Sequence, residues 1–263
     1  MATVCPLFSG STGNSTYIAA QNGAILVDAG ASLKAIVSAL DNVGGNIEKI
    51  SAVAITHTHG DHICGIKPIL NKTKAPLIAS KQTIEYLASH DKIPSHTEVI
   101  ETDSKSPVEI AGFGLSFFDT PHDCNGSGGY SIFLPDGKKM TVCTDLGVVT
   151  ESIRKSLMGS NCVLLESNHD ITMLKNGPYP PQLKVRILSD QGHISNLACA
   201  AEVQNLLKSG TTRFILGHLS QHNNMPMLAK CTSENALADM GALNGEDYIL
   251  RVAAPTGNGV TVF

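Results

Sequence analysis

Four side chains that can bind metal ions lie within six residues of one another in the segment THTHGDH, residues 56–62. The apolar run before it, residues 50–55, is short and partly β-branched, which predicts a buried strand. Alternate side chains of an extended chain share a face, so His57 and His59 can face one ion. A chance cluster of surface histidines is the alternative, and these spacings disfavour it.

The same segment then turns toward a predicted helix over residues 63–70. Gly60 allows the turn, and Asp61 and His62 fall near the start of the helix, where they can face a second ion a few ångströms away. This spacing differs from HExxH, in which one helical face presents two histidines to a single zinc. The sequence therefore predicts a centre with two metal ions.

Three further motifs offer ligands for such a centre, and each ends a predicted strand. They are TPHD with His122, TDLG with Asp145, and LGHLS with His218. A carboxylate can bridge two cations with its two oxygens, which suits Asp145. Ligands of layered α/β proteins collect at strand ends, so this placement fits one shared site.

Composition places the chain among soluble globular proteins, with 263 residues, 42% hydrophobic and 16% charged. We expect one domain over residues 1–263 in the cytoplasm, because no apolar stretch approaches the ~20 residues that span a bilayer. The N-terminus resembles no signal peptide. Seven cysteines without a CxxC pair predict reduced, buried thiols. A net charge of −4 provides no general attraction for nucleic acid, which would need a local patch. Lys175, Lys184 and Arg186 could form that patch or an ordinary solvated face.

Short β-like runs alternate with helical stretches in both halves, which predicts sheet layers covered by helices. The expected strands are residues 4–8, 16–20, 24–28, 50–56, 115–120, 130–134, 139–144, 163–166, 213–216, 248–252 and 260–263. The expected helices, besides residues 63–70, are residues 33–40, a stretch after Ser195, and residues 229–240. Residues 168–192 break the rhythm with the run GPYPP, and they form either a lid over the substrate or a plain surface loop.

Together the motifs resemble those of the metallo-β-lactamase superfamily over almost the whole chain. The resemblance implies an α/β fold, an αββα sandwich of two mixed sheets flanked by helices. It implies that Asp28, in the motif LVDAG, is a structural aspartate behind the metals. It assigns one ion to His57, His59 and His122, the other to Asp61, His62 and His218, and a bridging role to Asp145. His59 argues against the flavodiiron branch, which has Glu there, and Asp145 argues against zinc β-lactamases, which commonly have Cys.

A finer resemblance concerns three features in their order along the chain: Glu166, the motif GHISN with His193, and His218. This order is similar to that in ribonuclease Z, in which a Glu supports a His that protonates the leaving group. The sequences of four segments resemble still more closely those of the WalJ/YycJ family of bacterial metallo-hydrolases. These segments are GSTGNST, LESNHD, GPYP and GHLSQHNN. That resemblance implies a metal-dependent nuclease, a 5′→3′ exonuclease with DNA as its nucleic acid partner. It leaves the oligomeric state open.

Such a site suits phosphodiester hydrolysis. Two cations ~3.5–4 Å apart lower the pKa of a bridging water to give a hydroxide, and they clamp the attacking and leaving oxygens. Asp61 can hold a metal and orient the hydroxide, while His193, set by Glu166, can protonate the departing 3′ oxygen. The alternative for His193 is a histidine at a helix start near Ser195. A ligand set without sulfur suits Zn²⁺, Mn²⁺ or Fe²⁺.

Substrate contacts are predicted at four residues. Ser11 and Asn14 lie in the loop of residues 10–15, which could form a backbone nest for a phosphate or simply a tight hairpin turn. His169 is either a phosphate contact or a core histidine, and Asn196 follows His193 in the same motif. Two other functions stay open: a small-molecule hydrolase of thioesters, lactones or cyclic nucleotides, and a non-catalytic metal-holding adaptor. An adaptor has no use for a leaving-group acid.

Overall fold

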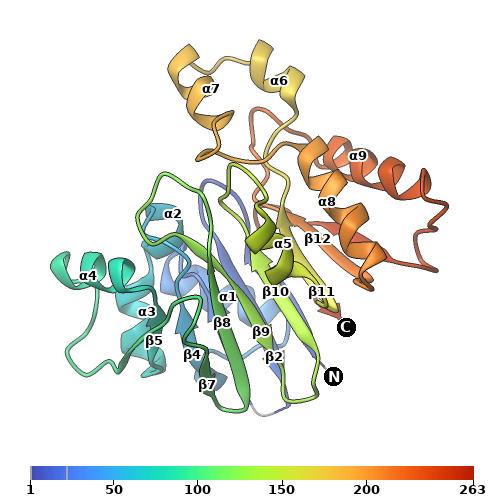
Figure 1. Ribbon diagram of the computed structural model, residues 1–263. Coiled ribbons are helices and arrows are strands. Elements are labelled where there is room, and N and C mark those ends of the chain that lie inside the picture. Colours follow the sequence, from blue (N-terminus) through green and yellow to red (C-terminus); the bar gives the residue numbers. More distant parts are fainter. Residues whose placement is uncertain (1, 22) are drawn as a thin grey trace.

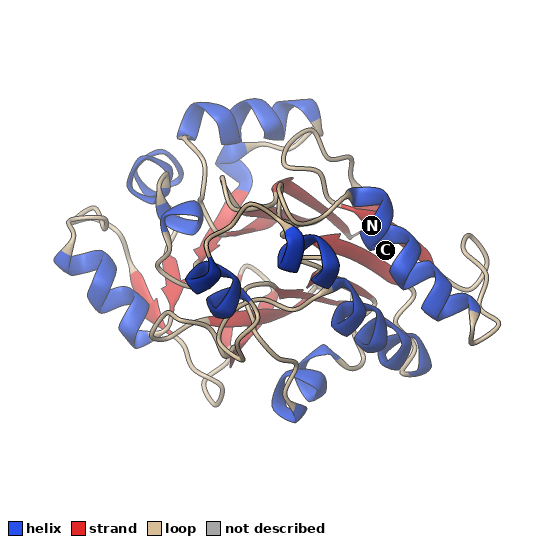
Figure 2. Cartoon of the chain, turned by 90° about the horizontal axis from the view of Figure 1, so that it is seen from above, coloured by secondary structure: helices blue, strands red, loops and turns tan. Residues whose placement is uncertain are grey.

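The computed structural model describes residues 2–21 and 23–263, so Met1 and Asn22 of the expected domain lie outside the described residues. Two seven-stranded sheets stack face to face, with helices on both outer sides (Figures 1 and 2). This arrangement is the predicted sandwich of two mixed sheets flanked by helices. Among the described helices, none has the length and apolar character that crossing a membrane requires.

The first sheet comes from the N-terminal half apart from its edge strand β14. Its spatial order is β14 (Thr261–Val262), β1 (Thr3–Phe8), β2 (Ser15–Ala20), β3 (Gly23–Val27), β4 (Ile50–Ala54), β5 (Leu77–Ala79) and β6 (Val99–Glu101). The pairs from β14 to β3 are antiparallel, and those from β3 to β6 are parallel. Parallel neighbouring strands need a crossover connection, usually a helix, so such connections are expected between β3 and β6.

The second sheet repeats this plan. Its spatial order is β7 (Val108–Ile110), β8 (Phe113–Asp119), β9 (Gly128–Phe133), β10 (Lys139–Cys143), β11 (Cys162–Glu166), β12 (Arg213–Gly217) and β13 (Ile249–Val252). Pairs from β7 to β10 are antiparallel and those from β10 to β13 are parallel. The carboxyl ends of the parallel strands in each sheet lie at one edge, where ligands collect in α/β proteins.

Three hydrophobic layers hold the sandwich together. The middle layer joins the inner faces of both sheets, through side chains such as Ile25, Val27, Phe117, Tyr130 and Val142. The first outer layer packs the first sheet on α1 (Leu33–Asn42), α3 (Ile66–Thr73) and α4 (Lys81–Ser89). The second packs the other sheet on α5 (Glu151–Leu157), α8 (Asn196–Lys208) and α9 (Pro226–Ala238). Strands buried on both faces read as apolar runs, which is why the sequence marks them clearly.

Most expected elements are present with ends shifted by a few residues, and several elements were not anticipated. Strands β5, β6 and β7, with helices α4 and α5 and the short 3₁₀ helix Ile47–Lys49, have no counterpart among the expectations. The strands in question have only three residues each, too few for alternation to become visible. Helix α4 is capped by Ser80, whose side chain accepts from the backbone N–H of Thr83.

The single helix expected over residues 63–70 is two helices. Helix α2 (Gly60–Ile63) ends before Gly65, and α3 begins after it. The backbone passes so close to the β3 exit that a Cβ on Gly65 would lie 1.9 Å from the carbonyl oxygen of Ala31. The Gly65 N–H donates to the carbonyl of Ala29 at 2.8 Å, outside any helical pattern. This contact separates the THTHGDH turn from the supporting helix α3.

Residues 168–192 form two short helices above the edge of the sandwich, α6 (Ile171–Asn176) and α7 (Pro181–Ile187) (Figure 1). The run GPYPP was not expected to be helical, yet Pro181 begins α7. Proline is accepted at a first helical position because its missing N–H has no intrahelical partner there. The expectation of irregular backbone was therefore wrong for Pro181.

Candidate metal centre

The predicted metal ligands, with Asp28 and Glu166, meet at one edge of the sandwich, at the carboxyl ends of β3, β4, β8, β10, β11 and β12. Three of them, Asp28, Asp145 and His218, have left-handed backbone angles, with φ of 63°, 61° and 54°. Such angles are uncommon outside glycine and concentrate at functional sites. The chain turns sharply as each strand ends, which aims these three side chains across the edge.

His57, His59 and His122 form the first group. One ring nitrogen of each lies within 4.8 Å of the others, which is close enough for a shared ion. His122 donates its Nδ1–H to the carbonyl of Gly192 at 3.1 Å, so its Nε2 is the nitrogen left for a metal. Nδ1 of His57 lies 3.0 Å from the Thr56 hydroxyl, which likewise leaves Nε2.

Asp61, His62 and His218 form a second group that meets the same 4.8 Å limit. Asp61 begins the turn after Gly60, and its backbone carbonyl packs against the exit of β3. A Cβ on Gly30 would lie 1.7 Å from that carbonyl oxygen, so only glycine fits there. The motif LVDAG therefore fixes the position of Asp61 as well as supplying Asp28.

Asp145 lies between the two groups. Its Oδ2 is 3.3 Å from Nε2 of His62, and its Oδ1 is 3.9 Å from Nε2 of His122. Oδ1 also lies 3.4 Å from Nδ1 of His218, so the carboxylate is within reach of histidines of both groups. A carboxylate in this position can contribute one oxygen to each of two ions, the arrangement that the sequence predicts.

Asp28 lies behind this cluster and is 3% exposed. Its carboxylate accepts from the backbone N–H of Thr56 at 2.9 Å, and Nδ1 of His62 donates to it at 2.8 Å. Oriented in this way, His62 presents Nε2 to the ligand cluster. Carboxylates commonly fix metal-binding histidines by this contact. Thr56, which sequence reasoning passed over, contacts Asp28, His57 and His62 through one hydroxyl.

Glu166 is fully buried and holds two histidines at once. Its Oε1 accepts from Nδ1 of His193 at 2.9 Å and from Nδ1 of His218 at 2.7 Å. Backbone N–H groups, including that of Ile194 at 3.0 Å, occupy Oε2. Because its oxygens are occupied, Glu166 is suited to orienting histidines. The predicted pairing of Glu166 with His193 is present, and the shared contact with His218 was not foreseen.

Several buried polar atoms of the cluster have no hydrogen-bond partner, and they indicate which kind of ligand the cluster would bind. Nε2 of His57, Nε2 of His218 and Oδ2 of Asp145 are buried without a hydrogen bond of good geometry. Buried polar atoms are almost always paired, so an unpaired set on facing residues needs an explanation. Nitrogen and carboxylate donors of this kind fit a divalent transition metal. The residues present therefore fit two such ions.

The charges of the cluster shift several pKa values. Burial alone would lower the pKa of His62, but Asp28 and Asp145 raise it well above the usual value. Burial also opposes charge on His218, yet Asp145, Asp61 and Glu166 raise its pKa to about 10. Against the effect of burial, His218 and His62 hold the pKa of Asp145 well below its usual range. Without metal, His62 and His218 thus form a protonated network with the carboxylates, whereas burial lowers the pKa of His57 and of His59.

Metal loading should therefore release protons. Nδ1 of His62 and of His218 already face carboxylates, so an ion must replace the proton on each Nε2. We expect addition of Zn²⁺ to metal-free protein near neutral pH to release on the order of two protons. Calorimetry in two buffers with different ionisation enthalpies measures this number, which should fall as the pH approaches 10. Loading without proton release would contradict the protonated network.

Two predicted substrate contacts, Ser11 and Asn14, lie in the turn between β1 and β2. Ser11 is exposed. Asn14 is buried, and its Nδ2 lies 3.1 Å from Oδ2 of Asp61 and 2.9 Å from Nε2 of His62. These contacts favour a positioning role for Asn14 over the predicted contact with substrate. The N–H of Gly13 bonds the carbonyl of Gly10, so the loop contains the tight turn that was its other interpretation.

The other two, His169 and Asn196, are buried, each about 1% exposed. Asn196 forms a reciprocal amide pair with Asn224 at 2.9 Å in both directions, and its Oδ1 also accepts from the Ser167 hydroxyl. Its polar atoms are occupied, which favours a role in joining β11 to the start of α8 over the predicted substrate contact of Asn196. Both ring nitrogens of His169 lack partners, and burial lowers its pKa to about 4. This placement agrees with a core histidine.

Asp123 is a site residue that the sequence analysis missed. Its Oδ1 lies 3.5 Å from Nε2 of His122 and 3.6 Å from Nε2 of His59. Its other oxygen accepts from the Arg186 guanidinium, which ties α7 to the edge of the cluster. In the sequence, Asp123 could have been recognised by its position directly after His122. Lys184, the other predicted cation of this segment, donates to the Lys175 carbonyl at 2.7 Å.

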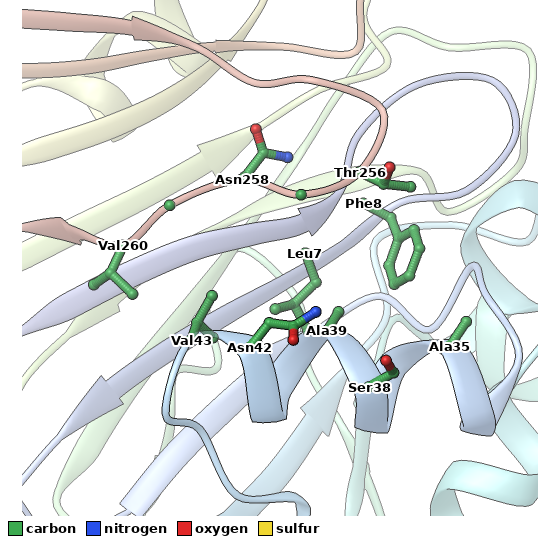
Figure 3. Close-up of a pocket in the computed structure, with 12 residues that line it drawn as sticks. Leu7, Phe8, Ala35, Ser38, Ala39, Asn42, Val43, Thr256, Asn258 and Val260 are labelled. Carbon is green, nitrogen blue, oxygen red and sulfur yellow. The ribbon is translucent and has the colours of Figure 1, made fainter.

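A large cavity lies elsewhere, between α1 and the segment 256–260 near the C-terminus (Figure 3). It has a volume of about 860 Å³ and includes Phe8, Ser38, Asn42 and Thr256. None of the described residues that line it has an ionisable side chain, so it lacks the groups for acid–base or metal chemistry. A smaller cavity of about 700 Å³ adjoins His59 and Asp123.

Comparison with known proteins agrees with this fold and cluster. The metallo-β-lactamase fold protein YhfI from Bacillus subtilis superimposes with a TM-score of 0.71 at 18% identity, covering 99% of this chain and 98% of that one. The model of the beta-lactamase superfamily domain matches residues 24–219. The predicted metallo-β-lactamase fold is therefore confirmed.

Two curated relatives match along nearly the whole chain. Exodeoxyribonuclease WalJ of Streptococcus pneumoniae is 35% identical over 256 residues, covering 95% of this chain and 93% of the relative. Exodeoxyribonuclease YycJ of Bacillus anthracis is 33% identical over 256 residues, covering 95% and 94%. The chain belongs to the metallo-β-lactamase superfamily and, within it, to the family of WalJ and YycJ.

Proposed function

We propose that this protein is an exodeoxyribonuclease that hydrolyses phosphodiester bonds of DNA at a centre of two divalent metal ions. Full-length similarity to WalJ and YycJ carries this proposal. The donor set agrees with it, because candidate donor atoms of His57, His218 and Asp145 are buried without hydrogen-bond partners. Zn²⁺, Mn²⁺ and Fe²⁺ all suit such ligands.

The proposed ligands are those of the two histidine groups, with Asp145 between them. His57, His59 and His122 would hold one ion, and Asp61, His62 and His218 the other. When bound, two such ions activate a water and neutralise charge on the phosphate. Asp28, Thr56 and Asn14 hold His57, His62 and Asp61 in place.

His193 is the proposed proton donor to the leaving oxygen. Its Nδ1 bonds Glu166, so Nε2 is the nitrogen that can give a proton, and its side chain is 15% exposed, which permits contact with a substrate. Asp61 is 23% exposed and can orient the attacking water. A group within hydrogen-bond reach of both the substrate and a buried carboxylate is typical of general acids.

The direct test uses purified protein with end-labelled DNA and RNA duplexes and added Mn²⁺ or Zn²⁺. We expect short products from one DNA end, resolved on a gel, and loss of this activity with a chelator. Cleavage of a lactone or thioester, without metal-dependent activity on any nucleic acid, would refute the nuclease and favour a small-molecule hydrolase.

Arg186 and Lys184 provide a second test of the DNA substrate. Arg186 is half exposed on α7 and pairs with Asp123, the residue after His122. Both cations could meet phosphates if α6 and α7 cover the substrate. Replacing both with Ala should weaken DNA binding and reduce the slope of log affinity against log salt by about one for each lost phosphate contact. Fluorescence anisotropy at several salt concentrations measures the slope.

The matched control replaces Lys208 and Arg213 with Ala. Lys208 ends α8 and Arg213 begins β12, so both lie at the ends of their elements away from the ligand cluster. The control variant also removes one lysine and one arginine charge, and we expect it to leave the slope of log affinity against log salt almost unchanged. Equal slopes for the two double variants would remove Lys184 and Arg186 from the DNA path.

A further inference from the structure

A polar groove leads away from the proposed metal centre along α4. Its volume is about 700 Å³, and His59 and Asp123 form the end nearest the centre. Gln82, Glu85 and Tyr86 of α4 line one side, with Asn125 opposite. Because His59 belongs to the first histidine group, a molecule held at that group could extend directly into the groove.

The two walls of the groove are fixed to each other. The Ser80 hydroxyl, at the N-cap of α4, donates to the carbonyl of Gly126 at 2.8 Å. Near His59, the Thr58 hydroxyl and the Cys124 thiol lie 3.1 Å apart. These contacts connect α4 and the THTHGDH segment to the loop that carries His122. The groove is therefore built in the folded chain, and a ligand would not have to open it.

Tyr86 presents an aromatic ring on the α4 wall. The residue is 40% exposed, although large aromatic side chains are usually buried. Its ring stacks on His90, with centroids 4.0 Å apart and planes at 23°. The His90 ring is held there by Nδ1, which lies 2.8 Å from the Tyr86 carbonyl. Tyr86 lines the groove and His90 does not, so the imidazole supports the phenol ring from the other side.

The chemistry of the groove suits a base better than a phosphate. Among the described residues that line it there is no lysine or arginine, whereas Glu85 and Asp123 carry carboxylates. Asp123 is already paired with Arg186, which leaves Glu85 as the unpaired charge facing the groove. Carboxylate and amide groups such as Glu85 and Gln82 can bond the amino and ring N–H groups of bases. An exposed aromatic ring can stack on any base.

We propose that this groove binds the nucleobase next to the phosphate that is cleaved, with Tyr86 stacked on the base. This inference rests on the proposed function, because the phosphate of the same nucleotide would lie at the metal centre. Stacking does not depend on base identity, so the subsite fits an enzyme that removes successive nucleotides of any sequence.

The test combines Tyr86→Ala with DNA that lacks single bases. Oligonucleotides with one abasic position, moved stepwise from the cleaved bond, are assayed for KM with Mn²⁺. With native protein, one position should raise KM about tenfold, the usual worth of one stacked base. Tyr86→Ala should raise KM for intact DNA by a similar factor and lose the penalty at that position. Tyr86→Phe, which keeps the ring, should behave as the native protein.

Two controls separate the possible outcomes. Phe133→Ala removes an aromatic side chain of similar exposure, 47% against 40% for Tyr86, from the end of β9 away from the centre, and it should leave KM unchanged. Hydrolysis of bis(p-nitrophenyl) phosphate, which has no base, should change far less than DNA cleavage in Tyr86→Ala. Active protein whose KM for DNA is the same with and without Tyr86 would overturn the subsite alone. Failure of the native protein to cleave DNA would overturn the nuclease and the subsite together.

Discussion

Asp145→Asn is expected to abolish binding of both metal ions and to reduce DNA cleavage more than any other single change. Asp145 faces His62 with one oxygen and His122 with the other, and an amide can supply only one oxygen. Loss of metal stabilisation worth several kcal/mol corresponds to a decrease of roughly 10³-fold or more in kcat. Elemental analysis and kcat for DNA are the two measurements.

The variant should still fold, since Asn tolerates the left-handed angle that Asp145 adopts. His218→Ala is the comparison, because His218 belongs to one histidine group only, and it should mainly deplete one ion. If fully loaded native protein contained a single ion, the bridging role of Asp145 would be wrong.

His193→Ala should retain both ions and slow cleavage of DNA on the order of 10²–10⁴-fold, the usual contribution of a general acid. The nucleoside leaving group needs a proton, whereas p-nitrophenolate leaves without one. The loss with a p-nitrophenyl phosphodiester should therefore be far smaller, and rates with the two substrates measure the difference. Equal losses would show that His193 has another role.

Glu166→Gln separates the two contacts of this carboxylate. If Glu166 acted on His193 alone, the variant would reproduce the substrate selectivity of His193→Ala with full metal content. The structure shows the same oxygen 2.7 Å from His218, so we expect metal content to fall as well. An intact metal content would mean that the contact with His218 contributes little to binding.

Much of the candidate site could be predicted because its residues follow strands that the sequence marks clearly. His57, Asp145 and His218 come just after buried, largely apolar strands, and His122 follows β8 by three residues; the ends of such strands converge at one edge of a sheet. The pairing of Glu166 with His193 could be predicted for the same reason. Local pattern and the resemblance together were enough for these residues.

Contacts between distant segments could not be predicted in this way. Asn196 reads as a site residue because it follows His193 closely, but its partner Asn224 lies 28 residues further along the chain. Asp123 accepts a hydrogen bond from Arg186, which lies 63 residues away in the chain. The short strands β5 to β7 depend on their neighbours in the sheet more than on their own sequence. In each case a tertiary contact decided the outcome.

The proposed ligands come from both sheets, with His57 after β4 in the first and His218 after β12 in the second. A shared pair of ions would thus close loops of the chain much as a disulfide does, although the seven cysteines, all among the described residues, are free. A cross-link restricts an unfolded chain only while it holds, and metal ligands dissociate when protonated. The two halves of the sandwich would then be joined reversibly, and the supply of metal would set how long the fold resists opening.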